Sequence, residues 1–436
     1  MKRDFFSYYC IRALIAPFGF LSYSLIHCIG RWVGSLAFYL LPNFRKRTLS
    51  NLALATDLHL EKKELISIAK ASLQNLAINM LEYPKLAKET NFSRVIQCEN
   101  PEVADALYRS GQGIIFFCGH QSNWEVLFLD GTSRMKGIAI GKPIKNKRLY
   151  QWIVKIREKN GGKIISPHNA LREALRSLKK GVFLGIVGDQ GMPDSGYCFP
   201  FFGRRAWNST APALLSYKTN SPIIVATTKR TQDGYRIHYS DPLFPNCTEP
   251  LEQEVKRLMD HSLFLLQESI RQNPEEWLWQ HNRWKQQTPK ILKKKFRQDC
   301  IAIILPPQKE EVDAILPHLK TLKKIYPQNF ISLMAPEQCK NSAFIDVDEL
   351  FFYRDVKETL MSDYRFKLIF NFTSYKKIKK HYKALSAFAS LSLKDLQKLS
   401  RINCPTGCSD LSEVFIHALC QPAAIAALKE LALNAP

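Results

Sequence analysis

Acidic residues are scarce in this 436-residue chain, which has 39 Asp and Glu against 62 Lys and Arg and a formal net charge of +23. Such a charge says little about the fold, but it favours anionic partners such as nucleic acid, lipid headgroups or an acidic carrier protein. The sequence has no basic motif interleaved with aromatic residues and no recognised nucleic-acid module, which argues against nucleic acid. A membrane surface and an acidic carrier protein are therefore the expected partners.

The eleven cysteines include no C-x-x-C pair. Cys404 and Cys408 are four positions apart with no paired His nearby, so a zinc site is not indicated. A disulfide framework is unusual in a chain of this size, and we expect reduced thiols that face the cytosol.

Charged side chains are missing from residues 13–30, a segment just long enough to span or embed in a bilayer. No A-x-A cleavage site follows, which predicts a retained anchor over residues 1–41 rather than a secretory signal. Basic residues are in slight excess after the segment, which places the body of the protein in the cytoplasm. The alternatives are a buried core helix and, because Pro17 and Gly19 interrupt the segment, a re-entrant or interfacial helix.

From residue 111 onward, short apolar runs alternate with helical patterns, which predicts an α/β sheet with helices on both faces. The expected strands are residues 114–118, 137–141, 163–166, 182–189 and 222–230. A basic stretch then separates a domain over residues 42–290 from a second, smaller α/β domain over 299–436, where the alternation restarts. That second domain has no G-x-G-x-x-G and no phosphate-binding glycine loop, so no nucleotide site is indicated.

The stretch IIFFCGHQSNWE, residues 114–125, places His120 and Glu125 just after a predicted strand. Ligand sites in open α/β sheets lie at strand ends, and Gly119 allows a close backbone approach. We expect His120 and Glu125 to meet at the N-terminus of the next helix, where a carboxylate fixes the His tautomer and backbone N–H groups can receive an oxyanion. The structural alternative is a capping box in which Ser122 caps the helix and Glu125 answers it.

A protein nucleophile is not evident beside this pair. No G-x-S-x-G follows, so a hydrolase serine is not indicated. Cys118 lies in an apolar strand, where a core position is the simpler interpretation. His120 and Glu125 therefore have the character of the base and orienter of a catalytic triad, with a substrate hydroxyl as the nucleophile.

At these residues the chain resembles the H-x4-D/E motif of glycerolipid-type acyltransferases. The wider context is similar to one branch, the lipid A biosynthesis acyltransferases of lauroyl or myristoyl type, which add secondary acyl chains to Kdo-bearing lipid IVA. Five blocks match in order: CGHQSNWE, KPIKN with KIREKNGG, LKKGVFLGIVGDQG, FPFFGRRAWNSTAPALL and NPEEWLWQHNRWK. Together with the N-terminal segment they cover about residues 1–290, which makes residues 42–290 the expected acyltransferase domain.

The resemblance implies four catalytic residues. His120 would be the general base on an acceptor hydroxyl and Glu125 its orienter. Arg157 would bind the substrate or the developing oxyanion, and Asp189 would organise the site, for instance by holding Arg157. The implied reaction moves a fatty acyl group from acyl carrier protein to a lipid A precursor at the cytoplasmic face of the inner membrane, without a metal or organic cofactor.

Basic residues are the expected substrate contacts, because both the carrier protein and the lipid phosphates are anionic. A solvated helix face is the structural alternative for the stretch 142–163, which holds eight Lys or Arg against one Glu. The candidate substrate-binding residues are Lys142, Lys145, Lys147, Arg148, Arg204 and Arg205.

The chain departs from the family pattern in two places. Glycerophosphate acyltransferases carry an F-P-E-G-x-R type block, whereas FPFFGRR here has no Glu, which disfavours a glycerophosphate acceptor. The residues after 299 weakly resemble half of a heptosyltransferase-type, Rossmann-like glycosyltransferase, and half a fold of that kind predicts no activity. Two alternative functions remain at this stage: acyl transfer to another lipid or glycolipid, and a non-catalytic membrane-bound scaffold.

Overall fold

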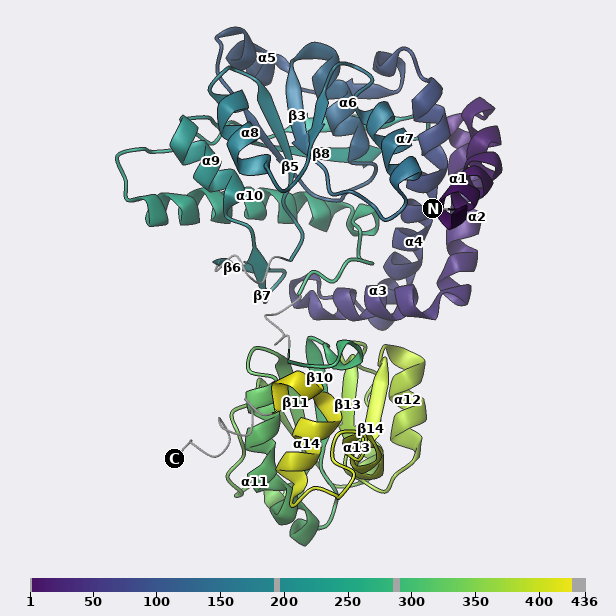
Figure 1. The fold of residues 1–436 in the computed structure, drawn as a ribbon, viewed down its shortest axis with the longest axis vertical. Coiled ribbons are helices and arrows are strands. Elements are labelled where there is room, and N and C mark those ends of the chain that lie inside the picture. The colour runs from purple at the N-terminus through teal and green to yellow at the C-terminus, as the bar shows by residue number, and fades with distance from the viewer. Residues whose placement is uncertain (1, 192–196, 285–290, 426–436) are drawn as a thin grey trace. The chain divides into compact units, whose positions relative to one another are not determined.

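The computed structural model describes residues 2–191, 197–284 and 291–425, which form two compact units (Figure 1). Unit 1 contains residues 1–42 and 55–283, and unit 2 contains residues 43–54 and 284–436. Residues 43–54 thus group with the C-terminal part of the chain, whereas the division made from the sequence placed them in the central domain.

Unit 1 begins with helices and continues as an α/β sheet. Its helices are α1 (Lys2–Ile15), α2 (Tyr23–Leu40), α4 (Lys62–Lys88), α5 (Glu102–Arg109), α6 (Glu125–Arg134), α7 (Lys147–Arg157), α8 (Ala170–Leu178), α9 (Ala211–Thr219) and α10 (Leu251–Gln272). Short 3-10 turns lie at η1 (Ala16–Phe20), η2 (Thr56–Leu58), η3 (Phe92–Arg94) and η5 (Pro274–Glu276). Its strands are β1 (Ile96–Cys98), β2 (Ile115–Cys118), β3 (Gly137–Ile140), β4 (Lys163–Ile165), β5 (Phe183–Val187), β6 (Tyr197–Phe201), β7 (Arg204–Asn208), β8 (Ile223–Arg230) and β9 (Tyr235–Tyr239).

The main sheet of unit 1 has seven strands in the order β1-β9-β8-β2-β5-β3-β4. All of its pairings are parallel except β8 with β9, so the sheet is mixed. The α/β class predicted from the sequence is confirmed, and β2 lies centrally, as its unbroken apolar run suggests. Strands β1 and β9 and the separate β6–β7 hairpin were not predicted; β1 has three residues, too few to show a period.

The single apolar helix expected over residues 13–30 does not form. Helix α1 ends at Ile15, a 3-10 turn follows that carries Pro17 and Gly19, and α2 begins after Ser22, whose side chain caps it. Proline lacks an N–H and favours the first turn of a new helix over the middle of a long one. Among the helices that the structure describes, none by itself combines the length and the hydropathy of a membrane span. The bent pair α2 and α3 (Pro42–Leu54) has both when its two helices are taken together.

Helix α2 packs closely along α4 because two glycines face it. A Cβ on Gly34 would come within 2.2 Å of the Gln74 backbone, and one on Gly30 within 2.5 Å of the Ile78 side chain. Larger residues at these positions would separate the helices. Helix α4 is therefore fixed against α2 on one side, and its other contacts, described below, reach the candidate site.

Unit 2 is a second α/β fold with a five-stranded parallel sheet in the order β12-β11-β10-β13-β14. This order, 3-2-1-4-5 along the chain, is that of a doubly wound sheet. Its strands are β10 (Cys300–Ile304), β11 (Phe330–Pro336), β12 (Glu349–Tyr353), β13 (Leu368–Asn371) and β14 (Ala389–Ser392). Its helices are α3, α11 (Lys309–Ile325), α12 (Lys377–Leu385), α13 (Leu393–Ser400) and α14 (Leu411–Leu419), with 3-10 turns η6 (Lys294–Phe296), η7 (Glu337–Cys339) and η8 (Val356–Thr359).

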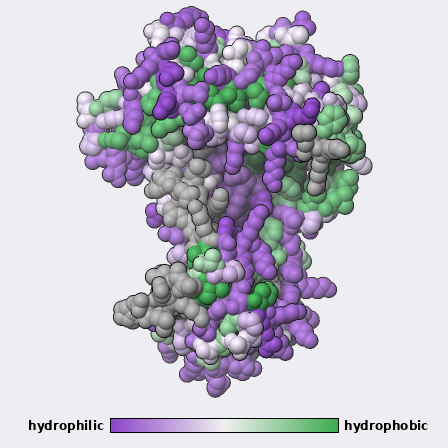
Figure 2. All heavy atoms as spheres, viewed as in Figure 1, coloured by the Kyte–Doolittle hydropathy of each residue, from purple (hydrophilic) through white to green (hydrophobic). Residues whose placement is uncertain are grey.

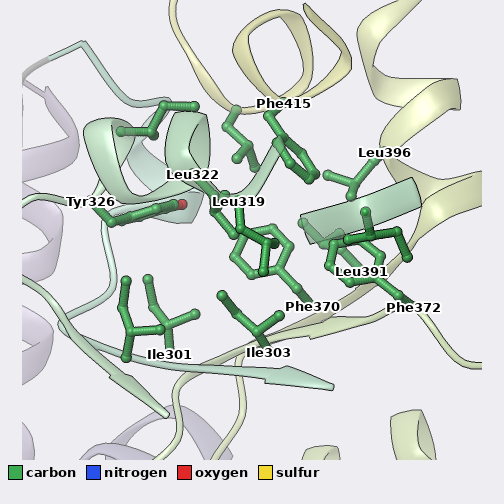
Figure 3. Packing of buried hydrophobic residues seen from close by; sticks show 14 of the residues in the cluster. Ile301, Ile303, Leu319, Leu322, Tyr326, Phe370, Phe372, Leu391, Leu396 and Phe415 are labelled. Carbon is green, nitrogen blue, oxygen red and sulfur yellow. The ribbon is translucent and has the colours of Figure 1, made fainter. Parts of the chain in front are cut away.

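The core of unit 2 lies between this sheet and its helices. Figure 3 shows Ile301 and Ile303 of β10 beneath Leu319 and Leu322 of α11, with Phe415 of α14 beside them. Helix α3 joins the same unit through polar contacts: Ser50 Oγ donates to the Arg365 carbonyl at 2.8 Å and Lys46 Nζ to the Ala387 carbonyl at 2.8 Å.

A buried ion pair also lies beside α3. Lys367 Nζ is 3.0 Å from Asp299 Oδ2 and 3.3 Å from Asn51 Oδ1, and both charged side chains are almost fully buried. Removing one member of a buried pair leaves the other charge uncompensated, which costs about 3–5 kcal/mol.

We predict that Lys367→Met lowers the free energy of unfolding of the full-length protein by about 3–5 kcal/mol. The measurement is urea unfolding monitored by circular dichroism. The matched control is Lys379→Met, because Lys379 lies 3.5 Å from Asp395 but is half exposed. Exposed pairs contribute about 0–1 kcal/mol. Equal losses in the two variants would contradict the structural role assigned to the Lys367 pair.

Candidate active site

His120 lies two residues after the end of β2, whose four residues are all buried between β5 and β8. Gly119 precedes it, and a Cβ there would lie 2.9 Å from a Leu266 methyl carbon and 3.1 Å from Asp189 Oδ2. Any larger residue would therefore disturb the approach of Asp189. The sequence thus brings an imidazole to the carboxyl end of a central strand, where ligand sites in such sheets lie.

Asp189 follows β5, the strand beside β2, and its carboxylate accepts three N–H hydrogen bonds. Its Oδ2 accepts from the His120 backbone N–H at 2.7 Å and from the Trp277 indole N–H at 2.7 Å. Its Oδ1 lies 2.7 Å from His120 Nδ1. Only 2% of the Asp189 surface is exposed. The carboxylate therefore fixes both the backbone and the ring of His120.

Charge and hydrogen bonding keep Asp189 ionised. Burial raises the pKa of its carboxyl, but the charge of His120 and the hydrogen bonds from His120 and Trp277 outweigh burial and hold the pKa far below its usual range. An ionised carboxylate only accepts hydrogen bonds, so His120 Nδ1 carries a proton and Nε2 is the nitrogen that can take one from a substrate.

The Nε2 side of His120 opens toward solvent. Gln190 Nε2 lies 3.2 Å from His120 Nε2, and Gln190 is exposed. The Trp124 ring packs against the imidazole at 4.6 Å between centroids, and the His281 ring stacks parallel to it at 6.4 Å. A substrate hydroxyl could therefore replace the Gln190 amide at Nε2 while Trp124 and Asp189 hold the ring.

Glu125 binds Arg157 rather than His120. Arg157 Nε donates to Glu125 Oε2 at 2.6 Å, its Nη2 donates to Oε1, and the Tyr83 hydroxyl donates to Oε1 at 2.8 Å. Burial lowers the pKa of the Arg157 guanidinium, but the charge and hydrogen bonds of Glu125 outweigh burial and raise it above its usual value. The bidentate pair holds a permanent cation in place at the end of α7.

The structure brings the four predicted catalytic residues together as two pairs, His120 with Asp189 and Glu125 with Arg157. The sequence-based expectation paired them the other way, with Glu125 on His120 and Asp189 on Arg157. The local backbone explains the difference. Ser122 has φ +47°, in the left-handed region, and α6 begins only at Glu125, so the chain turns between His120 and the Glu125 carboxylate.

The capping-box alternative is not observed. The N-cap residue of α6 is Trp124, which makes no side-chain capping bond, and the Glu125 N–H is received by Asn123 Oδ1 at 3.3 Å. The Glu125 carboxylate is engaged by Arg157 and Tyr83 instead. The Glu125 side chain therefore makes a tertiary contact and does not cap α6.

Two residues of this arrangement were not predicted as site residues. Trp277 stood in the block NPEEWLWQHNRWK, but an indole N–H that meets a carboxylate 88 positions away leaves no local pattern. Tyr83 lies on the long helix α4, and its contact with Glu125, 42 positions away, likewise leaves no local pattern.

The predicted substrate-binding residues lie apart from these two pairs in the chain. Lys142 and Lys145 are exposed in the loop before α7, and Lys147 and Arg148 are in its first turn, where Lys147 is exposed. The Arg148 guanidinium also covers the Phe5 ring of α1 at 5.0 Å. Arg204 and Arg205 begin β7, where Arg204 is half-buried and Arg205 is exposed.

Cys118 lies near the site but is unsuited to nucleophilic attack. Burial raises the pKa of its thiol, with the charges of Asp189 and Glu125 adding to the effect. A thiol in that environment stays protonated and unreactive. Among the described residues, no group of three or more His, Cys, Asp or Glu side chains could hold a metal ion.

Replacement of Asp189 tests the three-donor arrangement without reference to activity. In Asp189→Asn the side-chain amide places its own N–H opposite one of the three donors, which then has no acceptor. We therefore expect a loss of about 2–4 kcal/mol of unfolding free energy at pH 7. Because the pKa of Asp189 is lowered by folding, its stabilisation is present above the unfolded value near 4 and is lost as pH falls toward the folded value.

Urea unfolding of both proteins across pH should therefore show a constant difference from pH 7 to pH 5. Below about pH 4 the difference should narrow by about 1.4 kcal/mol per pH unit. A difference that stayed unchanged down to pH 3, or an absence of any difference at pH 7, would contradict the ionised, triply bonded Asp189.

A search of curated proteins found no match. A family model described as bacterial lipid A biosynthesis acyltransferase matches residues 3–286, a range that contains all four residues of the two pairs together with Trp277 and Tyr83. Since this match covers well over half of the 436 residues, the chain belongs to the bacterial lipid A biosynthesis acyltransferase family.

Proposed function

We propose that this protein transfers a fatty acyl chain from acyl carrier protein to a hydroxyl group of a lipid A precursor of the Kdo-lipid IVA type. Membership of the family makes it an acyltransferase of lipid A biosynthesis and disfavours a purely scaffolding role. The observation that carries the finer proposal is the imidazole of His120, held by a buried carboxylate with Nε2 directed to an accessible position. That arrangement suits removal of a proton from an acceptor hydroxyl.

The proposed reaction proceeds in two steps. His120 Nε2 takes the hydroxyl proton as the acceptor oxygen bonds to the thioester carbonyl carbon, which gives a tetrahedral oxyanion. The carbon–sulfur bond then breaks, and His120 returns the proton to the departing carrier thiolate. Asp189 stays ionised throughout and stabilises the imidazolium that exists between the two steps.

Arg157 is the proposed oxyanion-stabilising group. Glu125 accepts hydrogen bonds from its Nε and Nη2, and we propose that Nη1 faces the developing negative charge. A guanidinium held rigidly before the reaction needs little reorganisation when charge appears. In this proposal Glu125 acts through Arg157, while the orienter of His120 is Asp189.

The basic residues before and within the first turn of α7 are the proposed docking site for the acidic carrier protein. They lie on or beside the helix whose last residue is Arg157, so a carrier bound there is linked through one rigid element to the site. Arg204 and Arg205 remain proposed contacts for substrate phosphates. Such contacts between exposed charges weaken as salt rises.

Exposed apolar side chains on α1, η1 and α2 form the proposed membrane-binding surface. The most exposed are Phe20 at 79%, Leu14 at 76%, and Phe6 and Trp32 at 72% each. In Figure 2 apolar atoms gather along the right-hand edge, where Figure 1 labels α1 and α2. Large exposed apolar groups of this kind typically mark membrane or protein contacts. We propose that this surface embeds in the cytoplasmic face of the inner membrane.

Unit 2 is proposed to contribute no catalytic group. All four residues of the two pairs belong to unit 1, and the family match ends at residue 286. The contribution of unit 2 would then be structural, through its own core and its contacts with helix α3.

The catalytic proposal is tested by incubating the purified protein with acyl carrier thioester and Kdo-lipid IVA and measuring the acylated lipid by mass spectrometry. His120→Ala should lower the rate by about 10²–10⁴, the usual contribution of a positioned general base. His281→Ala is the matched control, because that imidazole stacks beside His120 but is not one of the three donors to Asp189, and it should retain most of the rate. Wild-type rates in His120→Ala would refute the mechanism, and transfer only to a different lipid would refute the acceptor.

The membrane proposal is tested by sedimentation with vesicles of phosphatidylethanolamine and phosphatidylglycerol. A variant with Phe20→Glu and Trp32→Glu should bind the vesicles at least about tenfold more weakly than the wild type, because two charges replace apolar groups at the interface. Phe264→Glu is the control, since Phe264 is likewise an exposed aromatic residue, at 52%, but lies on α10. Equal binding by all three proteins would place the contact elsewhere.

A further inference from the structure

A polar stripe runs along α4, the helix that packs against α2. Its members lie three or four residues after an earlier member, with the last two adjacent, which puts them on one side of the helix. They are Ser72, Asn75, Asn79, Glu82 and Tyr83. Polar groups along a mostly buried helix face require hydrogen-bond partners, and the partners of this stripe lie in the segments that carry the candidate site.

The polar stripe donates hydrogen bonds to two segments of the candidate site. Ser72 Oγ donates to the Trp277 carbonyl at 2.7 Å, and Asn75 Nδ2 donates to the Glu276 carbonyl at 2.9 Å. Further along, Asn79 Nδ2 donates to the Ser122 carbonyl at 2.5 Å. One helix thus supports both the residue that holds Asp189 and the loop between His120 and Glu125.

Glu82 is the charged centre of the stripe and is 0% exposed. Its Oε2 accepts from Asn123 Nδ2 at 2.8 Å and from the Tyr235 hydroxyl, and its Oε1 lies 2.8 Å from His27 Nε2. Burial raises the pKa of Glu82, but the charge of Arg230 and the hydrogen bonds of His27 and Tyr235 outweigh it, so the pKa lies below its usual value. Burying a carboxylate costs desolvation free energy, so its retention at this position suggests that the geometry it imposes on its partners has a use.

Asn123 transmits the position of Glu82 to the site. While its Nδ2 donates to Glu82, its Oδ1 accepts the Glu125 N–H at 3.3 Å at the start of α6. Asn123 follows Ser122, whose left-handed backbone is sparsely populated by residues other than glycine and persists where its surroundings fix it. The Glu125 carboxylate, and with it Arg157, therefore depends on where Glu82 holds Asn123.

His27 extends the network to α2. It is buried, with 3% exposed, and lies on the helix that also carries the exposed Trp32. The Glu82 carboxylate thus joins the helix of the proposed membrane-binding surface to the loop of the candidate site through two hydrogen bonds, one from each side.

We propose that Glu82 is a positioning residue for acyl transfer. Through Asn123 it fixes the start of α6 and the Glu125–Arg157 pair, and through His27 it fixes the position of the loop before α6 relative to α2. The inference rests on the proposed function. It differs from a purely structural role because it requires that the Glu82–Asn123 hydrogen bond set the rate of the chemical step.

The experiment exchanges donor and acceptor across this hydrogen bond. Asn123→Asp would bring two carboxylates face to face at the 2.8 Å contact, and Glu82→Gln would remove the charge that Asn123, His27 and Tyr235 bind. In the double variant the introduced glutamine amide can donate to the introduced aspartate, while the glutamine carbonyl still accepts from His27. That aspartate keeps an acceptor for the Glu125 N–H at a helix N-terminus, where a negative charge is favourable.

Each single variant should lower kcat by about 10-fold to 100-fold, the effect of small misplacements of catalytic groups, with little change in KM. The double variant should return to within about threefold of the wild-type kcat, as expected for a pair coupled by direct contact. Gln74→Ala is the matched control: Gln74 also joins α4 to α2, through a 2.8 Å bond to Ser35, but lies away from the loop. It should leave kcat unchanged.

Melting temperatures and backbone amide exchange over residues 121–126 complete the test. Exchange should be faster in both single variants and restored in the double variant. Wild-type kcat in folded single variants, or a double variant no better than the worse single, would overturn the inference. If the wild type made no acylated lipid, the proposed function would fail, and amide exchange alone would then decide whether Glu82 fixes this loop.

Discussion

The carboxylate of Asp189 is the contact on which the rest of the candidate site depends. It receives N–H groups from the backbone of His120, the ring of His120 and the indole of Trp277, so one buried anion joins the ends of β2 and β5 to the segment after α10. A buried carboxylate is stable only when several donors surround it, and here those donors are the groups that must be positioned. The buried charge, which its three donors stabilise, is therefore also the charge that holds His120 in place.

Helix α4 gives this arrangement its support. Its glycine-lined contact with α2 sets the distance between the two helices, and its polar stripe binds the Trp277 segment and the loop that leads to Glu125. The two pairs, His120 with Asp189 and Glu125 with Arg157, are thus separate in hydrogen bonding but share a scaffold. This separation suits the distinct tasks that we propose for them: one pair would handle the proton, and the other would present a fixed cation to the developing oxyanion.

The sequence predicted the α/β class, the central strand before His120 and the four residues of the two pairs, because apolar runs and ordered blocks are local patterns. It could not predict which carboxylate contacts His120 and which contacts Arg157, since that depends on the left-handed backbone of Ser122 and on the start of α6 at Glu125. It favoured one apolar helix over residues 13–30 and kept the interruption at Pro17 and Gly19 only as an alternative, and it did not predict the grouping of residues 43–54 with the C-terminal unit. Contacts such as Lys367 with Asn51, 316 positions apart, leave no periodic trace.

We propose that Asp189, and not Glu125, orients the general base. Single-turnover rates of acyl transfer from carrier thioester to Kdo-lipid IVA, measured for Asp189→Asn and Glu125→Gln across pH, distinguish the two residues. We expect a loss of about 10⁴ in rate for Asp189→Asn, which presents the wrong histidine tautomer, and a smaller loss of about 10²–10³ for Glu125→Gln, which loosens an oxyanion donor. A near-normal rate for Asp189→Asn beside an inactive Glu125→Gln would refute this assignment.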